Sequence, residues 1–235
     1  TAELRFDSTL GDTLSTLVGL FYSNETTDAT DVTSILPLSA VRTTVSATNA
    51  DTYAVFGTVF WKPTTAFEVS LGLRYDHEDR TAQGSITTVV PAGTIVSPVP
   101  IAQIKSDQVE PRLSLKYKFD DNVMVYGSVA RGYRGGGFNA PTAPTRTYRG
   151  DSAWTYEVGT KFSSTDRTIS LGAALFYSDY KDYIGLNSIA PAAGGGLVTV
   201  DLNTGDVRSY GAELEATFRP VRNFTLSGGL TYMNA

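Results

Sequence analysis

The sequence has no cysteine and only one histidine among its 235 residues. The absence of cysteine excludes a disulfide framework and any cysteine-ligated metal site. No apolar run approaches the roughly 18–20 residues that a transmembrane helix requires. A surplus of positive charge is also missing, because 24 acidic residues outnumber 19 Lys and Arg and give a net charge of −5. This balance argues against a nucleic-acid partner, which would be met by a basic face.

What the chain does contain is a regular alternation in its connections. Roughly ten strand-like segments are joined by links that switch between short and long. The short links are Thr9–Asp12, Lys62–Thr65, Asp120–Asn122, Ser163–Asp166 and Pro220–Asn223, and the long ones are about Glu25–Ala50, Thr81–Lys105, Gly135–Ser152 and Ile184–Thr204. An up-and-down sheet with all its tight turns at one end produces this order, and outer-membrane β-barrels have that anatomy.

Hydrophobicity alternates with period two along most of these segments. Between residues 66 and 79, Phe67, Val69, Leu71, Leu73 and Tyr75 fall on one face, opposite Glu68, Ser70, Gly72, Arg74 and Asp76. Aromatic residues stand near the ends of the apolar faces, as in the girdles of a membrane barrel. We therefore expect an all-β, antiparallel, up-and-down transmembrane β-barrel wall with strands of about 12–15 residues. Leu71, Leu73, Leu175 and Leu214 should face lipid, whereas Arg74, Gly172 and Glu213 should face the lumen.

Two segments, Tyr53–Trp61 and Val123–Arg134, are apolar on both faces. Their alternation does not assign a lumen face. Apolar residues on both sides of a strand suggest contact with a packed element inside the barrel.

One stretch carries a more specific signal. Val125–Asn139 reads VYGSVARGYRGGGFN and closely resembles a stretch characteristic of TonB-dependent outer-membrane receptors, where a strand ends in a phrase like SRGFKSGGFN. Other phrases fit the same family in the same order: ELRF (Glu3–Phe6), VGLFY (Val18–Tyr22), LGLRYDHE (Leu71–Glu78), PRLSLKYKF (Pro111–Phe119), TYEVGTKF (Thr155–Phe162), FYSDYKDYI (Phe176–Ile184) and the run from Tyr210 to Tyr232. The resemblance covers essentially the whole chain.

This resemblance implies a 22-stranded barrel with an N-terminal plug inside it. About ten strands cannot close such a wall. We therefore expect residues 1–235 to be a partial, open β-barrel domain, with the plug domain, the TonB box and the C-terminal strands absent from this sequence.

The resemblance also implies a function. A protein of this family lies in the cell outer membrane of a Gram-negative-type bacterium, surrounded by outer-membrane lipid. It actively imports a scarce nutrient, most often a ferric siderophore and sometimes cobalamin or a glycan, with energy delivered through TonB to the plug. No cofactor, no catalytic residue and no enzymatic activity are expected.

Candidate ligand contacts are basic and aromatic residues expected near the outer mouth: Arg131, Arg134, Arg146, Tyr148 and Arg149. Arginine is suited to an anionic ligand because its guanidinium donates charge-assisted hydrogen bonds. The glycine-rich run that begins at Arg131 lacks the Gly-Lys-Ser/Thr ending of a phosphate-binding loop. The simpler interpretation of that run is a strand passing into a flexible extracellular loop.

Three other motifs are weaker. His77 stands among Asp76, Glu78 and Asp79, but neighbours in a strand point to opposite faces, so no metal site is expected there. Asp201–Asp206 departs from a calcium loop, because its glycine is at the fifth position, and it reads as a turn. Glu213 and Glu215 share a strand face and could serve glycoside hydrolysis. The polar wall of a lumen explains both glutamates without catalysis.

Two alternatives to the transport receptor remain open at this point. One is a passive, porin-like outer-membrane channel, which would include a closed ten-stranded barrel. The other is a soluble β-sheet carbohydrate-binding module. Pairing of the segment near Leu4 with the segment near Leu230 would indicate the closed barrel.

Overall fold

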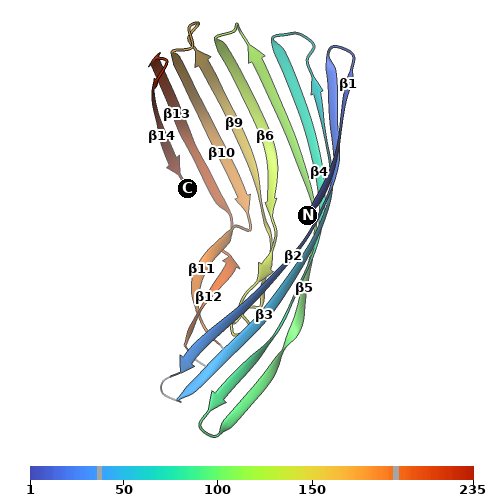
Figure 1. Ribbon diagram of the computed structural model, residues 1–235, viewed down its shortest axis with the longest axis vertical. Coiled ribbons are helices and arrows are strands. Elements are labelled where there is room, and N and C mark those ends of the chain that lie inside the picture. Colours follow the sequence, from blue (N-terminus) through green and yellow to red (C-terminus); the bar gives the residue numbers. More distant parts are fainter. Residues whose placement is uncertain (36–38, 193–195) are drawn as a thin grey trace.

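The fold is a curved antiparallel sheet of ten strands that follow one another in chain order (Figure 1). The computed structural model describes residues 1–35, 39–192 and 196–235. The sheet contains β1 (Ala2–Leu10), β2 (Leu14–Ile35), β3 (Ala40–Trp61), β4 (Phe67–Val90), β5 (Gly93–Lys118), β6 (Val123–Arg134), β9 (Asp151–Ser163), β10 (Ile169–Lys181), β13 (Val207–Val221) and β14 (Phe224–Asn234). Two small hairpin sheets are formed by β7 (Gly137–Phe138) with β8 (Thr147–Tyr148) and by β11 (Ile184–Pro191) with β12 (Leu197–Asn203). None of the described residues forms a helix of the length and hydrophobicity needed to span a membrane.

The sheet is open, as predicted. Leu4 in β1 lies opposite Leu20 in β2, and Leu230 in β14 lies opposite Leu214 in β13. β1 and β14 are the two ends of the strand order, so no described pairing joins them. A closed ten-stranded barrel is therefore excluded.

The short links predicted from the sequence lie together at one end of the sheet, as their alternation with long links indicated (Figure 1). Two of the long links, however, are not loops. Glu25–Ala50 and Thr81–Lys105 continue the strands, so that β2 and β3 have 22 residues each, β4 has 24 and β5 has 26. The expected length of about 12–15 residues is wrong for these four strands, because their continuations have the composition of loops. Those of β2, β3 and β4 are rich in Thr, and that of β5 contains Gly93, Pro98 and Pro100. Threonine is β-branched and favours strands.

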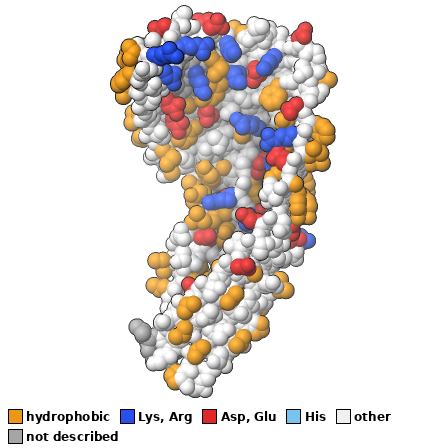
Figure 2. Space-filling view, viewed as in Figure 1, with side chains coloured by type: hydrophobic (Ala, Val, Ile, Leu, Met, Phe, Trp, Pro, Cys, Tyr) orange, Lys and Arg blue, Asp and Glu red, His pale blue; other side chains and the backbone are white. Residues whose placement is uncertain are grey.

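The register separates the two faces of the sheet as predicted. Leu71, Leu73, Leu175 and Leu214 lie on the face that we call outer, and their exposed fractions are 54–59%. The opposite, inner face carries the charged residues of the same strands. In Figure 2, acidic and basic side chains gather in the hollow of the sheet, and hydrophobic side chains line its outer rims.

Pairing also assigns the two strands that were ambiguous. In β3, Phe56 lies opposite Arg74 and therefore faces inward, whereas Val55 lies opposite Tyr75 and faces outward. The guanidinium of Arg74 stacks on Phe56 at 5.6 Å and on Phe21 at 5.2 Å, so the inner apolar residues of this region share one charged partner. In β6, Tyr126 faces inward, where Lys161 lies 6.0 Å from the centroid of its ring.

Aromatic residues mark two levels on the outer face. Five strands carry an aromatic pair separated by eight residues: Tyr53 and Trp61, Phe67 and Tyr75, Trp154 and Phe162, Tyr210 and Phe218, and Phe224 and Tyr232. Eight residues of strand span about 27 Å. With the usual tilt of about 40° this corresponds to about 20 Å of bilayer thickness, close to the height of the apolar band in membrane barrels. The outer face thus has the dimensions of a lipid-spanning wall.

On the inner face, three aromatic rings lie over glycines of the neighbouring strand. The directly opposed pairs are Phe56 with Gly19, Tyr126 with Gly159, and Phe176 with Gly211. A Cβ at Gly159 would come within 2.6 Å of the Tyr126 ring, and rings occupy the same space at the other two glycines. The glycines therefore let the rings lie against the wall.

The first prediction concerns the outer face. Leu71 lies midway between the aromatic residues Phe67 and Tyr75, so Leu71→Arg should cost about 2–4 kcal/mol of barrel stability in lipid. Gly172→Ser on the inner face is the control, because the nearest side-chain atom to its new Cβ would be 3.8 Å away. The measurement is unfolding of the complete protein in phospholipid bilayers. Equal stability of the two variants would contradict the assignment of faces.

Candidate functional site

The end of the sheet opposite the tight turns contains the candidate site. Here β6 and β9 are joined by the β7–β8 segment (residues 135–150), and β10 and β13 are joined by the β11–β12 hairpin. We call this end the mouth. Four of the five candidate residues lie in it: Arg134, Arg146, Tyr148 and Arg149.

The glycine run Gly135–Gly137, at the start of the β7–β8 segment, is closely packed against neighbouring residues and is not an unstructured loop. A Cβ on Gly135 would collide with Glu78, and one on Gly136 would lie 2.9 Å from the Gly150 nitrogen. A Cβ on Gly137 would lie 2.6 Å from the Tyr148 ring. The requirement for glycine is strictest at Gly136, because its neighbours there are backbone atoms of Tyr148, Arg149 and Gly150, whereas Gly135 and Gly137 lie against side chains.

Arg80 of β4 fastens this run to the wall. Its Nη1 donates to the Gly136 carbonyl at 3.0 Å, and its Nη2 donates to Glu78 at 2.6 Å. The glycine run is thereby fixed between β4 and β8. The interpretation of Gly135–Gly137 as part of a flexible loop is therefore replaced by a packed connection.

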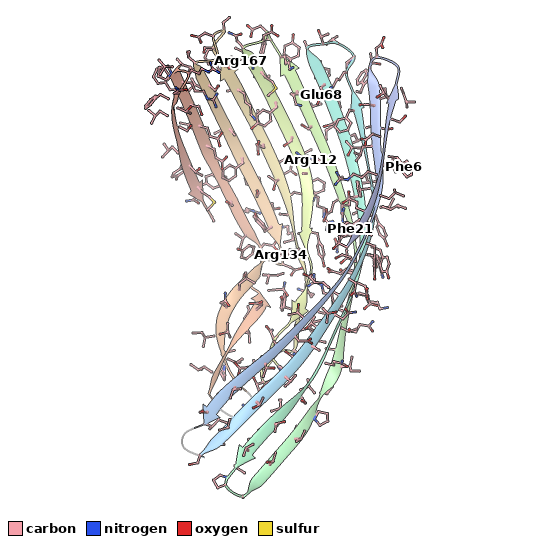
Figure 3. The ribbon with its side chains drawn as sticks, viewed as in Figure 1. Phe6, Phe21, Glu68, Arg112, Arg134 and Arg167 are labelled. Carbon is pink, nitrogen blue, oxygen red and sulfur yellow. The ribbon has the colours of Figure 1, made fainter. Side chains whose placement is uncertain are left out.

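Arg134 forms a latch at the point where the wall meets β11 (Figure 3). Its guanidinium pairs with both carboxylate oxygens of Asp151, with Nε to Oδ1 at 3.2 Å, and also donates to the Ile184 carbonyl at 3.1 Å. The Ile184 nitrogen in turn donates to Asp151 Oδ2 at 3.0 Å. Asp151 is 5% exposed and Ile184 is 1% exposed, so the partially exposed Arg134 of β6 joins two buried residues, one in β9 and one in β11.

The hydrogen bonds of the latch favour the charged form of the Arg134 guanidinium. Its hydrogen bond to Asp151 raises the pKa of the guanidinium above its ordinary value. The guanidinium also lies over the Tyr183 ring, 5.5 Å from the centroid. All of these partners belong to the protein, so Arg134 holds the mouth together before any ligand arrives.

Arg146 is folded back into its own segment. Its Nη1 donates to the Asn139 carbonyl, and the guanidinium carbon lies 5.9 Å from the centroid of the Phe138 ring. Its Nε and Nη2 are buried and meet no acceptor among the residues that the structure describes, and burial lowers the pKa of the side chain. Burial also raises the pKa of Tyr148, with the Asp201 carboxylate as a second cause. Both side chains thus lie in desolvated surroundings, where an added charge interacts strongly.

Arg149 and Arg131 differ from these residues in exposure and in position. The Arg149 side chain is 76% exposed, and its Nη2 donates to Asp182 at 2.7 Å.

Arg131 lies on the outer face of β6, where its Nη1 donates to the Val109 carbonyl at 2.7 Å and its Nη2 to Gln108 at 3.0 Å. The pairing of β5 with β6 ends at Arg112 and Ala130, so Arg131 supplies donors to the edge of β5 beyond that point.

Several residues that shape the mouth were not among the sequence candidates. They are Arg80, Asn139, Asp151 and Asn203. Asn139 is the last residue of the phrase Val125–Asn139 that carries the family resemblance, so that phrase could have identified Asn139 as a candidate. For the other three, no local pattern indicates the partner, because each partner is remote in sequence.

The strand that contains His77 has the two faces that alternation predicted. His77 lies on the outer face and its Nδ1 contacts Asp107 at 2.8 Å, whereas Glu78 points inward and pairs with Arg80. Within residues 1–35, 39–192 and 196–235, no three His, Cys, Asp or Glu side chains are placed to hold a metal ion. The expected turn over Asp201–Asp206 is wrong for its first three residues, because Asp201, Leu202 and Asn203 belong to β12; Thr204–Asp206 form the link to β13.

Comparison with known proteins gives consistent relatives. The family model for the β-barrel of TonB dependent receptor-like proteins matches residues 1–235. The pesticin receptor of Yersinia enterocolitica is 30% identical over 230 residues, which cover 92% of this chain and 31% of the relative. The pesticin receptor of Yersinia pestis is 30% identical over 224 residues, with the same shares covered.

Solved structures agree with these relatives. The ferric yersiniabactin uptake receptor FyuA from Yersinia pestis has a TM-score of 0.72 at 25% identity, covering 98% of this chain and 34% of that one. The ferric-catecholate import receptor Fiu from E. coli K12, in its open form, has a TM-score of 0.65 at 19% identity, covering 99% and 34%. The chain therefore spans about a third of the length of the proteins it matches.

The second prediction tests the latch. Asp151→Asn should destabilise the attachment of β11 by about 1–3 kcal/mol, because a charge-assisted pair and its hydrogen bonds are lost. The measurement is amide hydrogen exchange at Ile184 in the complete protein. Asp182→Asn is the matched control: its ion pair with Arg149 is exposed, so its contribution should stay within about 0–1 kcal/mol. Similar protection of Ile184 in both variants would contradict the latch.

Proposed function

The chain belongs to the TonB-dependent receptor β-barrel family, and from this premise we propose that the protein containing it imports a ferric siderophore through the outer membrane. The barrels of this family are outer-membrane proteins of Gram-negative bacteria, and this chain is one of them. The observation that carries the proposal is similarity of nearly the whole chain, at a TM-score of 0.72, to a protein described as a ferric yersiniabactin uptake receptor.

The proposed architecture places residues 1–235 within the barrel domain of a longer protein. The plug that receives energy through TonB, and the strands that complete the wall, are proposed to lie in parts of the protein outside this sequence. Two features support this: both edges of the sheet are unpaired in the strand order, and the chain covers 31% of its pesticin-receptor relatives.

The two faces of the sheet support a transport wall. The outer face exposes a continuous set of large apolar side chains between its two aromatic levels, which water would not stabilise. The inner face is charged, as the wall of an aqueous lumen is. A soluble carbohydrate-binding module is disfavoured by the first feature. The match to a receptor family supports the proposal that the protein acts as a receptor and not as an enzyme.

Three candidate residues are proposed as ligand contacts. Arg149 is exposed and keeps donors beyond the one used by Asp182, so it could meet an anionic chelate directly. Arg146 and Tyr148 would contribute after a local rearrangement of their segment. Arg131 and Arg134 are proposed to support the mouth, since their donors already have protein acceptors.

The third prediction tests transport. Cells expressing the complete protein should take up radiolabelled ferric yersiniabactin or a ferric catecholate, and uptake should vanish when TonB is deleted. Arg149→Ala should weaken binding about tenfold, as expected for one charge-assisted hydrogen bond, whereas Arg222→Ala in the β13–β14 turn should have no effect. Uptake that is independent of TonB and extends to unrelated small solutes would favour the porin-like channel.

The fourth prediction tests orientation. The segments 135–152 and 184–204 are proposed to lie outside the cell, where the long connections of membrane barrels lie. Because the chain has no cysteine, Ser188→Cys in β11 introduces its only thiol. A membrane-impermeant maleimide should label this thiol in intact cells, and it should fail to label a cysteine placed at Thr165 in the β9–β10 turn. Labelling of Ser188→Cys only after permeabilisation would reverse the orientation.

A further inference from the structure

Two asparagine side chains join the two segments of the mouth. Asn139 follows β7 and is 6% exposed. Its Oδ1 accepts a hydrogen bond from the Asp201 nitrogen at 2.8 Å, and its Nδ2 donates to the Asp201 carbonyl at 2.9 Å. Nδ2 also donates to the Thr145 carbonyl of its own segment at 3.0 Å. One side chain therefore satisfies both backbone groups of a residue in β12.

The second asparagine makes the same connection in the opposite direction. Asn203, at the end of β12, accepts from the Arg149 nitrogen at 2.9 Å through Oδ1. Its Nδ2 donates to the Arg149 carbonyl at 3.0 Å and to the Asp182 carbonyl at 2.7 Å. Each segment thus contributes one asparagine that pairs with the backbone of one residue in the other.

The chemistry of this arrangement requires an amide. A carboxamide offers an acceptor and a donor side by side, which is what a strand partner offers to a backbone N–H and C=O. An aspartate could accept from the N–H but could not donate to the carbonyl, which would lose its partner. In a site as buried as that of Asn139, an unpaired carbonyl is costly.

We propose that Asn139 and Asn203 form a reciprocal clasp that makes the β7–β8 segment and the β11–β12 hairpin move as one body. The clasp continues into β11, because Asp201 Oδ1 accepts from the Asn187 nitrogen at 3.0 Å. The latch at Arg134 and the bond from Arg80 to Gly136 fix this body to the wall at two points. A displacement of either segment is therefore transmitted to the other.

The clasp also assigns positioning roles for ligand recognition. Asn203 holds the backbone of Arg149, so it sets where that exposed guanidinium stands. A ligand that engages Arg149 would therefore act on β12 as well as on its own segment. This consequence rests on the proposed function, whereas the coupling of the two segments does not.

Amide hydrogen exchange of the complete protein in detergent tests the coupling without any ligand. Asn139→Asp should speed exchange about tenfold in β12, and Asn203→Asp should do the same at Tyr148–Arg149, because each variant removes a cross-segment donor. The double variant should add little to either single one. Asn223→Asp, in the β13–β14 turn at the far end of the sheet, is the matched control and should change neither region.

An effect confined to the substituted segment would overturn the proposal, as would additive effects in the double variant. Resistance of the barrel to unfolding in SDS at room temperature confirms that each variant is assembled. If the Asn139→Asp variant does not assemble, the Asn203→Asp variant alone tests the proposal. Asn203 lies in β12, and its predicted effect is at Tyr148–Arg149 in the β7–β8 segment. Binding of a ferric siderophore is measured separately. If each variant speeds amide exchange in the opposite segment but the protein binds no ferric siderophore, the proposed function is refuted and the clasp is still supported.

Discussion

Backbone hydrogen bonding between neighbouring strands is the constraint on which the whole structure depends. In hydrocarbon, no water can satisfy an unpaired N–H or C=O, so each strand of a membrane wall must pair on both sides. The observed registers run without interruption over long stretches of the wall, for instance over the twelve paired positions of β9 and β10. The pairing of β5 with β6 is shorter, because it ends at Arg112, three residues short of Val109, which lies opposite the aromatic residue Tyr75.

Continuous pairing in turn fixes the two faces. Because side chains alternate, one face is given entirely to lipid and the other to the lumen. The outer face contacts lipid through Leu and Val side chains that lie between the aromatic levels. The inner face must accommodate bulky and charged side chains. Its large rings lie over glycines such as Gly19 and Gly159, and its charges pair along the strand, as Arg74 does with Asp76 at 2.6 Å. Bulky side chains are thereby held against the wall.

At the mouth, side chains form the hydrogen bonds to backbone groups that a neighbouring strand provides elsewhere in the sheet. Arg131 donates to the edge of β5, Arg134 and Asp151 join three strands, and Asn139 and Asn203 pair with backbone groups across two segments. Each of these groups satisfies a backbone or buried polar atom that would otherwise be left without a partner. The same interactions order the surface that an incoming ligand would meet first, so stability and recognition share residues here.

The sequence by itself determined the class of the wall. Period two in segments such as Phe67–Tyr75 requires a sheet with unlike faces, and the alternation of links places its tight turns at one end. Both are local signals, since a strand shows its alternation without knowledge of its neighbours. Local composition was misleading at the far ends of β2–β5. The Thr-rich continuations of β2–β4 and the Pro-containing continuation of β5 have residues typical of loops, yet they pair as strands.

Only the tertiary structure decided the faces of Tyr53–Trp61 and Val123–Arg134, because residues that are apolar on both sides can be assigned only through the register with a neighbouring strand. It also decided which protein groups the candidate arginines contact. Arg131 and Arg134 are three residues apart, yet one caps an outer edge and the other closes an inner latch. Their acceptors, Val109 and Asp151, lie 22 and 17 residues away in sequence. Contacts between distant residues depend on how strands are brought together, and that information is absent from any local pattern.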